Sequence, residues 1–144
     1  MFQRILIPTD GSELSLKAVQ AAVQLAQRFH AQLHALTVTE PYPYSPLVEA
    51  QPVHPQEFLD AELRLANARL KLVRDAAAAA GVSCEGASVE GAQPWRAICD
   101  HATRVNADLI VMASHGRSGI AGLLLGSETQ KVLTHCTVPV LVVR

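Results

Sequence analysis

The sequence predicts a single-domain α/β protein with an open, doubly wound parallel sheet of five strands and helices on both faces. Short apolar stretches alternate with helical patterns along the whole chain, the order expected of successive β-α-β units. The stretch Leu109–Ala113 has no alternating polar positions, as expected of a strand buried on both faces. A chain of 144 residues suits one compact domain with its own core, so we expect residues 1–144 to form one domain.

Composition argues against several classes of function. The formal net charge is −1 and the basic residues are scattered, so no surface for nucleic acid or an anionic membrane is indicated. No apolar run is long enough for a membrane span or a signal peptide. Cys84, Cys99 and Cys136 show no C-x-x-C spacing, which suggests neither a disulfide framework nor a zinc site. We therefore expect a reduced, cytoplasmic protein that binds neither nucleic acid nor membranes.

The N-terminal part predicts a β-α-β unit. Residues Arg4 to Thr9 form a short apolar strand, and Ser12 is the expected N-cap of a helix from Leu14 to Phe29. The apolar stripe of this helix consists of Ala18, Ala22, Leu25 and Phe29. A second strand follows from Leu33 to Thr39. Because such connections are right-handed, the two strands should be parallel.

A proline-rich segment and a long helix come next. Residues 41–55 contain five prolines, which predicts an extended surface loop. Glu57 to Ala80 then predicts a helix, with Gly81 as its C-terminal cap. The residues expected on its buried face are Leu59, Leu63, Ala66, Leu70, Val73 and Ala77.

The C-terminal part completes the sheet. We expect a strand from Val82 to Val89, a helix from Pro94 to Val105 and the buried strand Leu109–Ala113. A helix over residues 128–136 and a last strand from Val138 to Val143 follow. In such sheets ligands bind outside the carboxyl ends of the strands, where the strand order reverses.

Two strand ends carry polar and flexible residues that suit a binding site. Asp10 follows the first strand, and a glycine-rich loop follows the fourth. In that loop Gly116, Gly119 and Gly122 allow a tight turn and a close approach of the backbone to a ligand. If the two strands are neighbours, Asp10 and the loop face one crevice. The alternative is that Asp10 only caps a helix and the glycines only turn the chain.

The helix after the glycine loop adds a second signal. Ser127 followed by Gln130 fits the Ser-x-x-Gln form of a capping box, so main-chain N–H groups and the positive end of the helix dipole point towards the crevice. Phosphate suits such a site. The chain has no Gly-x4-Gly-Lys-Ser/Thr and no Gly-x-Gly-x-x-Gly in its first turn, which excludes a P-loop and disfavours a dinucleotide fold. His115 lacks an evident orienting partner, so a structural or phosphate contact is favoured over acid-base catalysis.

The pattern Ala113-x2-Gly116-x9-Gly126-Ser127, with Pro8-Thr9-Asp10 and the final Val138–Val143, resembles the universal stress protein family over the whole chain. The resemblance implies a Rossmann-like fold of the adenine nucleotide alpha hydrolase type. In the ATP-binding branch of that family the motif is Gly-x2-Gly-x9-Gly-Ser/Thr. This chain departs from it at Ala113, which adds a methyl group where the backbone would face the nucleotide.

The resemblance also implies ligands. ATP would be bound with its phosphates at Gly116, Gly126, Ser127 and Thr129, with Asp10 near the ribose and Val38 against the adenine. Arg117 could add a positive charge to the phosphates, and Mg²⁺ or Mn²⁺ could bridge them. The complete set of candidate cofactor-binding residues is Pro8, Thr9, Asp10, Val38, Met112, Ala113, Ser114, His115, Gly116, Arg117, Gly119, Gly126, Ser127, Glu128 and Thr129.

Three functions are consistent with these residues. The first is an ATP-binding regulatory module of the stress response that acts through nucleotide-dependent dimer or partner interactions. The second is a slow ATPase, which is weaker because no base to position an attacking water is evident. The third is a nucleotide-free dimeric interaction protein, which Ala113 favours. In each case the apolar strand Val138–Val143, at a sheet edge, predicts a homodimer.

Overall fold

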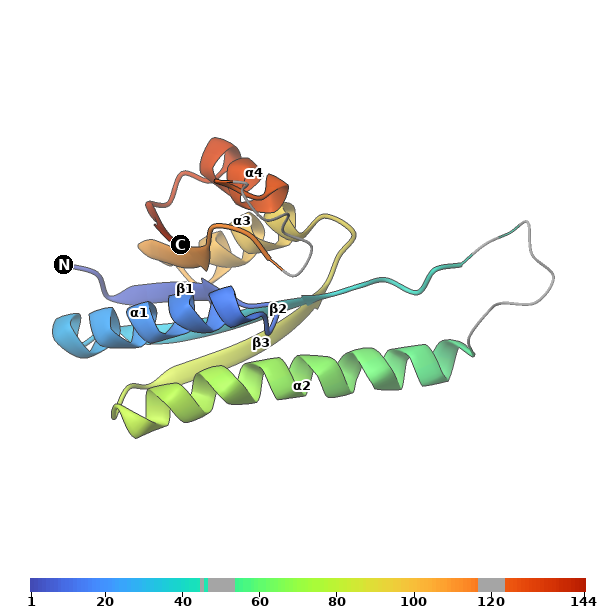
Figure 1. Cartoon of the computed structure of the whole chain (residues 1–144), viewed down its shortest axis with the longest axis horizontal. Helices are drawn as coiled ribbons and strands as arrows, with labels where there is room; N and C mark the ends of the chain where they lie inside the picture. Colours follow the sequence, from blue (N-terminus) through green and yellow to red (C-terminus); the bar gives the residue numbers. More distant parts are fainter. Residues whose placement is uncertain (45, 47–53, 117–123) are drawn as a thin grey trace.

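The computed structural model describes residues 1–44, 46, 54–116 and 124–144. Its five strands form one parallel sheet in the order β3-β2-β1-β4-β5 (Figure 1). The elements are β1 (Arg4–Pro8), α1 (Glu13–Phe29), β2 (Gln32–Thr39), α2 (Pro55–Ala79), β3 (Cys84–Glu90), α3 (Pro94–Arg104), β4 (Leu109–Ala113), α4 (Ser127–His135) and β5 (Val140–Val143). The order reverses between β1 and β4, which pair directly, so the predicted fold class is confirmed.

The sheet has an apolar core on each face. On one face, Ile5 and Ile7 of β1 pack in a cluster with the buried residues of α1 and α2. On the other face, Leu6 of β1 packs with buried residues of α3 and α4. Successive strand residues point to opposite faces, which explains this division. All five residues of β4 are buried, as its sequence predicted.

The two predicted helix caps have different outcomes. Ser12 is the N-cap of α1, and its hydroxyl accepts a hydrogen bond from Ser15 N at 3.2 Å, as predicted. The capping box at Ser127 was wrong, because Gly126 is the N-cap of α4 and Ser127 is its first helical residue. The amide of Gln130 does not reach back as a capping box requires and instead donates to Leu125 O at 3.1 Å.

Helix α2 is longer than predicted and begins at Pro55, so that residue belongs to the helix and not to the loop. Its C-terminal part is buried as expected, but Leu59 and Leu63 are 45% and 57% exposed, which corrects their prediction as core residues. Figure 1 shows the reason, since the N-terminal part of α2 extends beyond the sheet. Gly81 follows the helix with φ +68°, consistent with its predicted capping role.

The cysteines correct a further expectation. Cys99 of α3 and Cys136, the residue after α4, form a disulfide with a Cα–Cα distance of 5.4 Å, and Cys84 is free. The sequence suggested no disulfide because 37 residues separate the two cysteines and their spacing matches no motif. They meet only because α3 and α4 pack side by side on the same face of the sheet.

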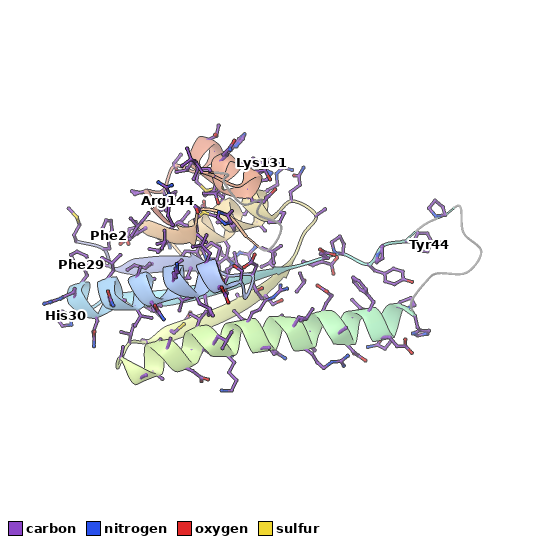
Figure 2. The ribbon with its side chains drawn as sticks, in the orientation of Figure 1. Phe2, Phe29, His30, Tyr44, Lys131 and Arg144 are labelled. Carbon is purple, nitrogen blue, oxygen red and sulfur yellow. A yellow bond between two sulfur atoms is a disulfide. The ribbon has the colours of Figure 1, made fainter. Side chains whose placement is uncertain are left out.

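Aromatic side chains lie at both ends of the molecule. Phe2 and Phe29 pack edge to face near the amino end of β1, with ring centroids 5.6 Å apart, whereas Tyr44 lies far away beyond the opposite end of the strands (Figure 2). No helix of the described residues is long and apolar enough to cross a membrane. β5 lies at one edge of the sheet, and within the described ranges its partner strand is β4.

Candidate functional site

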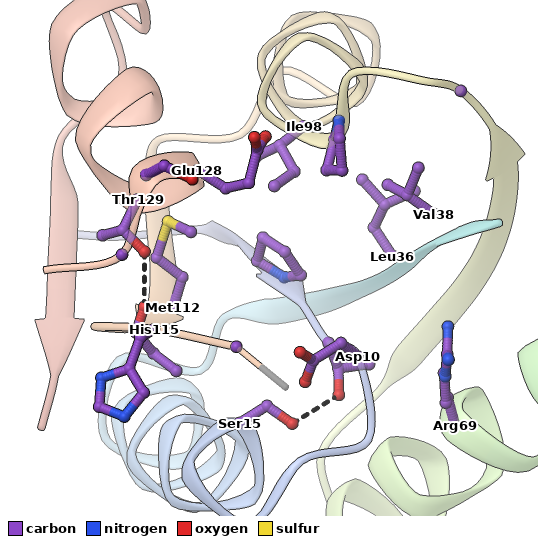
Figure 3. A pocket seen from close by; sticks show the side chains of 18 of the residues that line it. Asp10, Ser15, Leu36, Val38, Arg69, Ile98, Met112, His115, Glu128 and Thr129 are labelled. Carbon is purple, nitrogen blue, oxygen red and sulfur yellow. Dashed lines mark hydrogen bonds between the residues drawn. The ribbon is translucent and has the colours of Figure 1, made fainter. Parts of the chain in front are cut away.

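A pocket of about 870 Å³ opens at the carboxyl ends of the central strands, where the strand order reverses (Figure 3). Its volume lies within the range of small-molecule sites. Every described candidate residue of the sequence prediction lines this pocket except Ser114, which is buried. Arg117 and Gly119 lie outside the described residues. The structure thus brings together residues from β1, β2, β4 and α4 that the chain holds far apart.

The amino end of α4 lies against the end of β4. Gly126 N donates to Ser114 O at 2.7 Å, and the first hydrogen bond within the helix runs from Gln130 N to Gly126 O at 3.0 Å. The N–H groups of residues 127–129 therefore have no acceptor within the helix. A Cβ atom on Gly126 would lie 3.1 Å from the Cα and Cβ atoms of His115, so glycine permits this close packing. The result is a helix N-terminus at the wall of the pocket, which suits an anion.

Two α4 side chains that the resemblance assigned to the nucleotide make internal contacts. Thr129 is 2% exposed, and its hydroxyl donates to Ala113 O at 2.9 Å, which ties α4 to the end of β4. The Glu128 carboxylate accepts a hydrogen bond from Trp95 N at 2.8 Å. Because Trp95 lies in the first turn of α3, Glu128 satisfies a main-chain donor there. Both residues line the pocket, but their side chains also hold its wall together.

Asp10 lies on the opposite side, at the end of β1. Its Oδ1 accepts a hydrogen bond from Ser12 N at 3.0 Å, which fixes the turn into α1. A Cβ atom on Gly116 would lie 2.5 Å from Asp10 Oδ2, closer than such atoms can approach. A larger residue at position 116 would force the carboxylate of Asp10 to move, so the two predicted strand ends do face one crevice.

The remaining wall is apolar and comes partly from residues that the sequence analysis missed. Figure 3 shows Leu36 and Val38 of β2 near Ile98 of α3, with Met112 on the β4 side. Pro94 and Ile98 were not candidates, because helical periodicity shows that a residue is buried but not that it lines a cavity.

Arg69 of α2 was also missed. Its Nη1 lies 3.4 Å from the hydroxyl of Thr37, and its Cγ would lie 3.2 Å from a Cβ on Gly11. Its position beside the buried Ala66 and Leu70 was the one available signal, since it places Arg69 at the margin of the inward face of α2. Arg69 brings a positive charge to the β2 side of the pocket, which Glu40 and Glu62 also line with negatively charged carboxylates.

The titratable side chains of the described residues are spread over the fold and form no metal-binding cluster. No group of three or more His, Cys, Asp or Glu side chains there could hold a metal ion. His115 Nδ1 lies 3.2 Å from the hydroxyl of Ser114, its neighbour in the chain. Burial lowers the pKa of His34 and of His101, but neither lines the pocket.

Comparison with known proteins places these features in a family. The sequence profile described as the universal stress protein family matches residues 1–144. The universal stress protein YxiE of Bacillus subtilis is 37% identical over 150 residues that cover all of both chains. A universal stress protein solved in complex with cAMP is 33% identical, with a TM-score of 0.75 over 99% of this chain and 97% of that one. UspA from Lactobacillus plantarum is 32% identical, with a TM-score of 0.79 over 99% and 97% of the two chains.

Proposed function

Because this chain belongs to the universal stress protein family, we propose that it is a regulatory protein of the stress response whose pocket binds ATP. The amino end of α4 at the wall of the pocket carries this proposal, since it directs main-chain N–H groups at a space of nucleotide size. The 33% identical universal stress protein solved with cAMP supports an adenine nucleotide as the class of ligand.

The walls of the pocket suggest how ATP lies in it. The phosphates lie at the first turn of α4, beside Gly126 and Ser127, where the N–H groups lack intrahelical acceptors. The adenine lies against Val38 and the apolar wall, and the ribose lies near Asp10. Ala113 lines the pocket and is 8% exposed, so its extra methyl group occupies little of the accessible space.

A divalent cation fits this proposal only as part of the ligand. Mg²⁺ prefers oxygen ligands, and in nucleotide sites it commonly takes several of them from phosphates and water. The described residues offer no cluster of three or more carboxylates, histidines or cysteines, so Mg²⁺ or Mn²⁺ here depends on the phosphates of ATP. The cation would offset the charge of the triphosphate at the helix terminus.

We assign regulation and not turnover as the main role. Hydrolysis requires a group that positions an attacking water, and the candidate His115 contacts the neighbouring Ser114 hydroxyl. The regulatory output acts through nucleotide-dependent contacts with a partner or within a homodimer joined by β5. Leu141 in the middle of that edge strand is 41% exposed, and a second subunit paired along β5 would cover this apolar edge. We also propose a cytoplasmic location.

The proposal is tested by substituting Ser127, the first residue of α4. Ser127→Glu places a carboxylate where the phosphates should lie, while an acidic residue in the first turn favours the helix itself. Ser127→Gln is the matched control, because its side chain has the same length and no charge. Titration calorimetry should give at least tenfold weaker ATP binding for Ser127→Glu than for Ser127→Gln, since like charges in a partly buried site repel by more than about 1.4 kcal/mol.

Adenosine separates the phosphate site from the base site. Its affinity should be the same in both variants, because it carries no phosphate. Equal ATP affinities in the two variants would remove α4 from the site. A parallel loss of adenosine binding would point to a damaged pocket and not to charge repulsion.

A further inference from the structure

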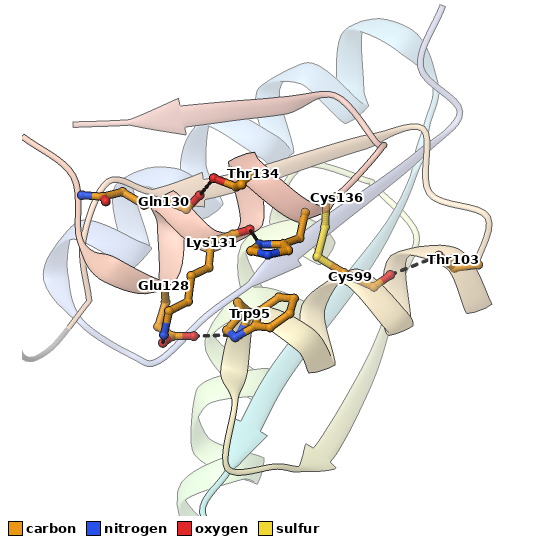
Figure 4. Close-up of a disulfide and its surroundings, with 9 residues drawn as sticks. Trp95, Cys99, Thr103, Glu128, Gln130, Lys131, Thr134 and Cys136 are labelled. Atoms are coloured by element: carbon orange, nitrogen blue, oxygen red, sulfur yellow. Dashed lines mark hydrogen bonds and ion pairs between the residues drawn. A yellow bond between two sulfur atoms is a disulfide. The ribbon is translucent and has the colours of Figure 1, made fainter.

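Three contacts fasten α3 to α4 along their length, and we call them the α3–α4 clasp (Figure 4). At one end the Glu128 carboxylate accepts from Trp95 N at 2.8 Å. In the middle the rings of Trp95 and His135 pack against each other at an interplanar angle of 33°, with centroids 4.4 Å apart. At the other end lies the disulfide between Cys99 and Cys136. Of these three contacts the disulfide is the covalent one, and it can be broken by reduction and formed again by oxidation.

The clasp connects two walls of the pocket. On α3, Pro94 and Ile98 line the pocket, and Ile98 is the immediate neighbour of Cys99. On α4, residues 127–130 line it and contain the N–H groups of the anion site. The position of α4 relative to α3 therefore sets the distance between the apolar wall and the anion site. A bond that fixes this position holds the pocket in the shape needed for binding.

The surroundings of the disulfide allow exchange. Cys99 and Cys136 are both half-buried, so the disulfide is not enclosed in the apolar core of the protein. In reducing compartments disulfides are usually transient and redox-sensing. We propose that Cys99 and Cys136 form a reversible redox site that exchanges with the glutathione pool, and that its oxidised state strengthens nucleotide binding in the adjacent pocket. This inference rests on the proposed nucleotide function.

Oxidised glutathione serves as the oxidant when the two cysteines form their disulfide. The thiolate of one cysteine attacks a sulfur of oxidised glutathione, forms a mixed disulfide and releases one reduced glutathione. The second cysteine, as its thiolate, attacks the protein sulfur of this mixed disulfide, and the second glutathione leaves as a thiolate. The two cysteines lose two electrons and two protons, and both electrons end on the two glutathione molecules. Reduction is the reverse reaction.

Coupling between the two sites must be reciprocal. If the oxidised protein binds ATP about tenfold more tightly, within the range usual for coupled sites, then saturating ATP stabilises the disulfide to the same extent. For a two-electron couple, this tenfold change makes the reduction potential of the disulfide about 30 mV more negative. The coupling can therefore be measured from either side.

The experiment uses the full chain with Cys84→Ser, which removes the third cysteine and leaves the clasp unchanged. Thiol titration should find no free thiol after oxidation and two after reduction. Calorimetry should then give about tenfold weaker ATP binding in the reduced protein, and the Cys99→Ser/Cys136→Ser variant should match the reduced form. Equilibration in glutathione buffers with and without ATP should give the matching shift in potential.

A measurement without nucleotide separates failure of this inference from failure of the proposed function. Hydrogen exchange at the first turn of α4 should quicken on reduction of the ligand-free protein, and the fluorescence of Trp95, the one tryptophan of the chain, should change. ATP binding that is equal in both redox states overturns the coupling but not the nucleotide site. If neither state binds ATP, the proposed function fails, and unchanged exchange at α4 then overturns the redox inference as well.

Discussion

Replacement of Thr129 by valine tests whether α4 is held to β4 as the structure indicates. The Thr129 hydroxyl donates to Ala113 O at 2.9 Å and the side chain is 2% exposed. Valine keeps nearly the same shape and a similar helix propensity, so the main change is the loss of the donor. Ala113 O then loses a partner at a place that water cannot easily reach.

The magnitude follows from this burial. A typical neutral hydrogen bond contributes about 0.5–1.5 kcal/mol net, and leaving a buried acceptor unsatisfied costs about 1–3 kcal/mol. We therefore expect Thr129→Val to lower the free energy of unfolding by about 1–3 kcal/mol. Because Thr129 also fixes the first turn of α4, the variant should bind ATP more weakly than the unmodified chain.

Urea denaturation of the oxidised protein measures this effect. The matched control is Thr134→Val on the same helix, where the hydroxyl donates to Gln130 O at 2.8 Å but the residue is exposed. Water replaces that exposed bond, so the control should change stability by no more than about 0.5 kcal/mol. If both variants unfold at the same urea concentration as the unmodified chain, the buried bond at Thr129 does not hold α4 in place.

Two further predictions concern stability and assembly. Burial, with nearby Arg4 for His34 and Arg104 for His101, lowers the pKa of both histidines, although Glu85 partly opposes this for His34, so the folded protein binds protons at these side chains less readily than the unfolded chain does. Unfolding then takes up protons near the unfolded pKa of about 6.5, so the free energy of unfolding should fall as the pH is lowered from 7 to 5.5, with a slope of at most about 1.4 kcal/mol per pH unit for each histidine. A urea midpoint that is constant over this range would contradict the assignment. Val142→Lys should convert the proposed homodimer to monomer or insoluble protein, because a desolvated ammonium at a paired edge has no partner, whereas light scattering that shows an unchanged dimer would place the interface elsewhere.

Local patterns predicted most of the fold. β4 was identified because an unbroken apolar run reports burial on both faces, and Ser12 was identified as a cap from its residue type and position. The sequence analysis left open whether the first and fourth strands are neighbours, and the structure shows that β1 pairs with β4, which brings Asp10 opposite Gly116 at the point where the strand order reverses. These features depend on short stretches of chain and on general rules of topology.

The predictions that were wrong or missing concern features that depend on how far a helix extends along the sheet and on how two helices pack together. Leu59 and Leu63 have the period of a buried face, but the sheet ends before it reaches them. The pairing of Cys99 with Cys136 and the contact of Glu128 with Trp95 arise from α3 and α4 packing together, which no local pattern reports. The place of Arg69 in the pocket likewise needs the register of α2 on the sheet.

The most direct test of the nucleotide site is residue-resolved NMR of the amide groups during titration with ATP. The predicted result is that the largest shifts occur at residues 127–130, with further shifts at Asp10 and Val38, and that adenosine reproduces the shift at Val38 but not those at the first turn of α4. If saturating ATP leaves residues 127–130 unchanged, or if the shifts lie outside the pocket, the nucleotide site proposed at α4 is wrong.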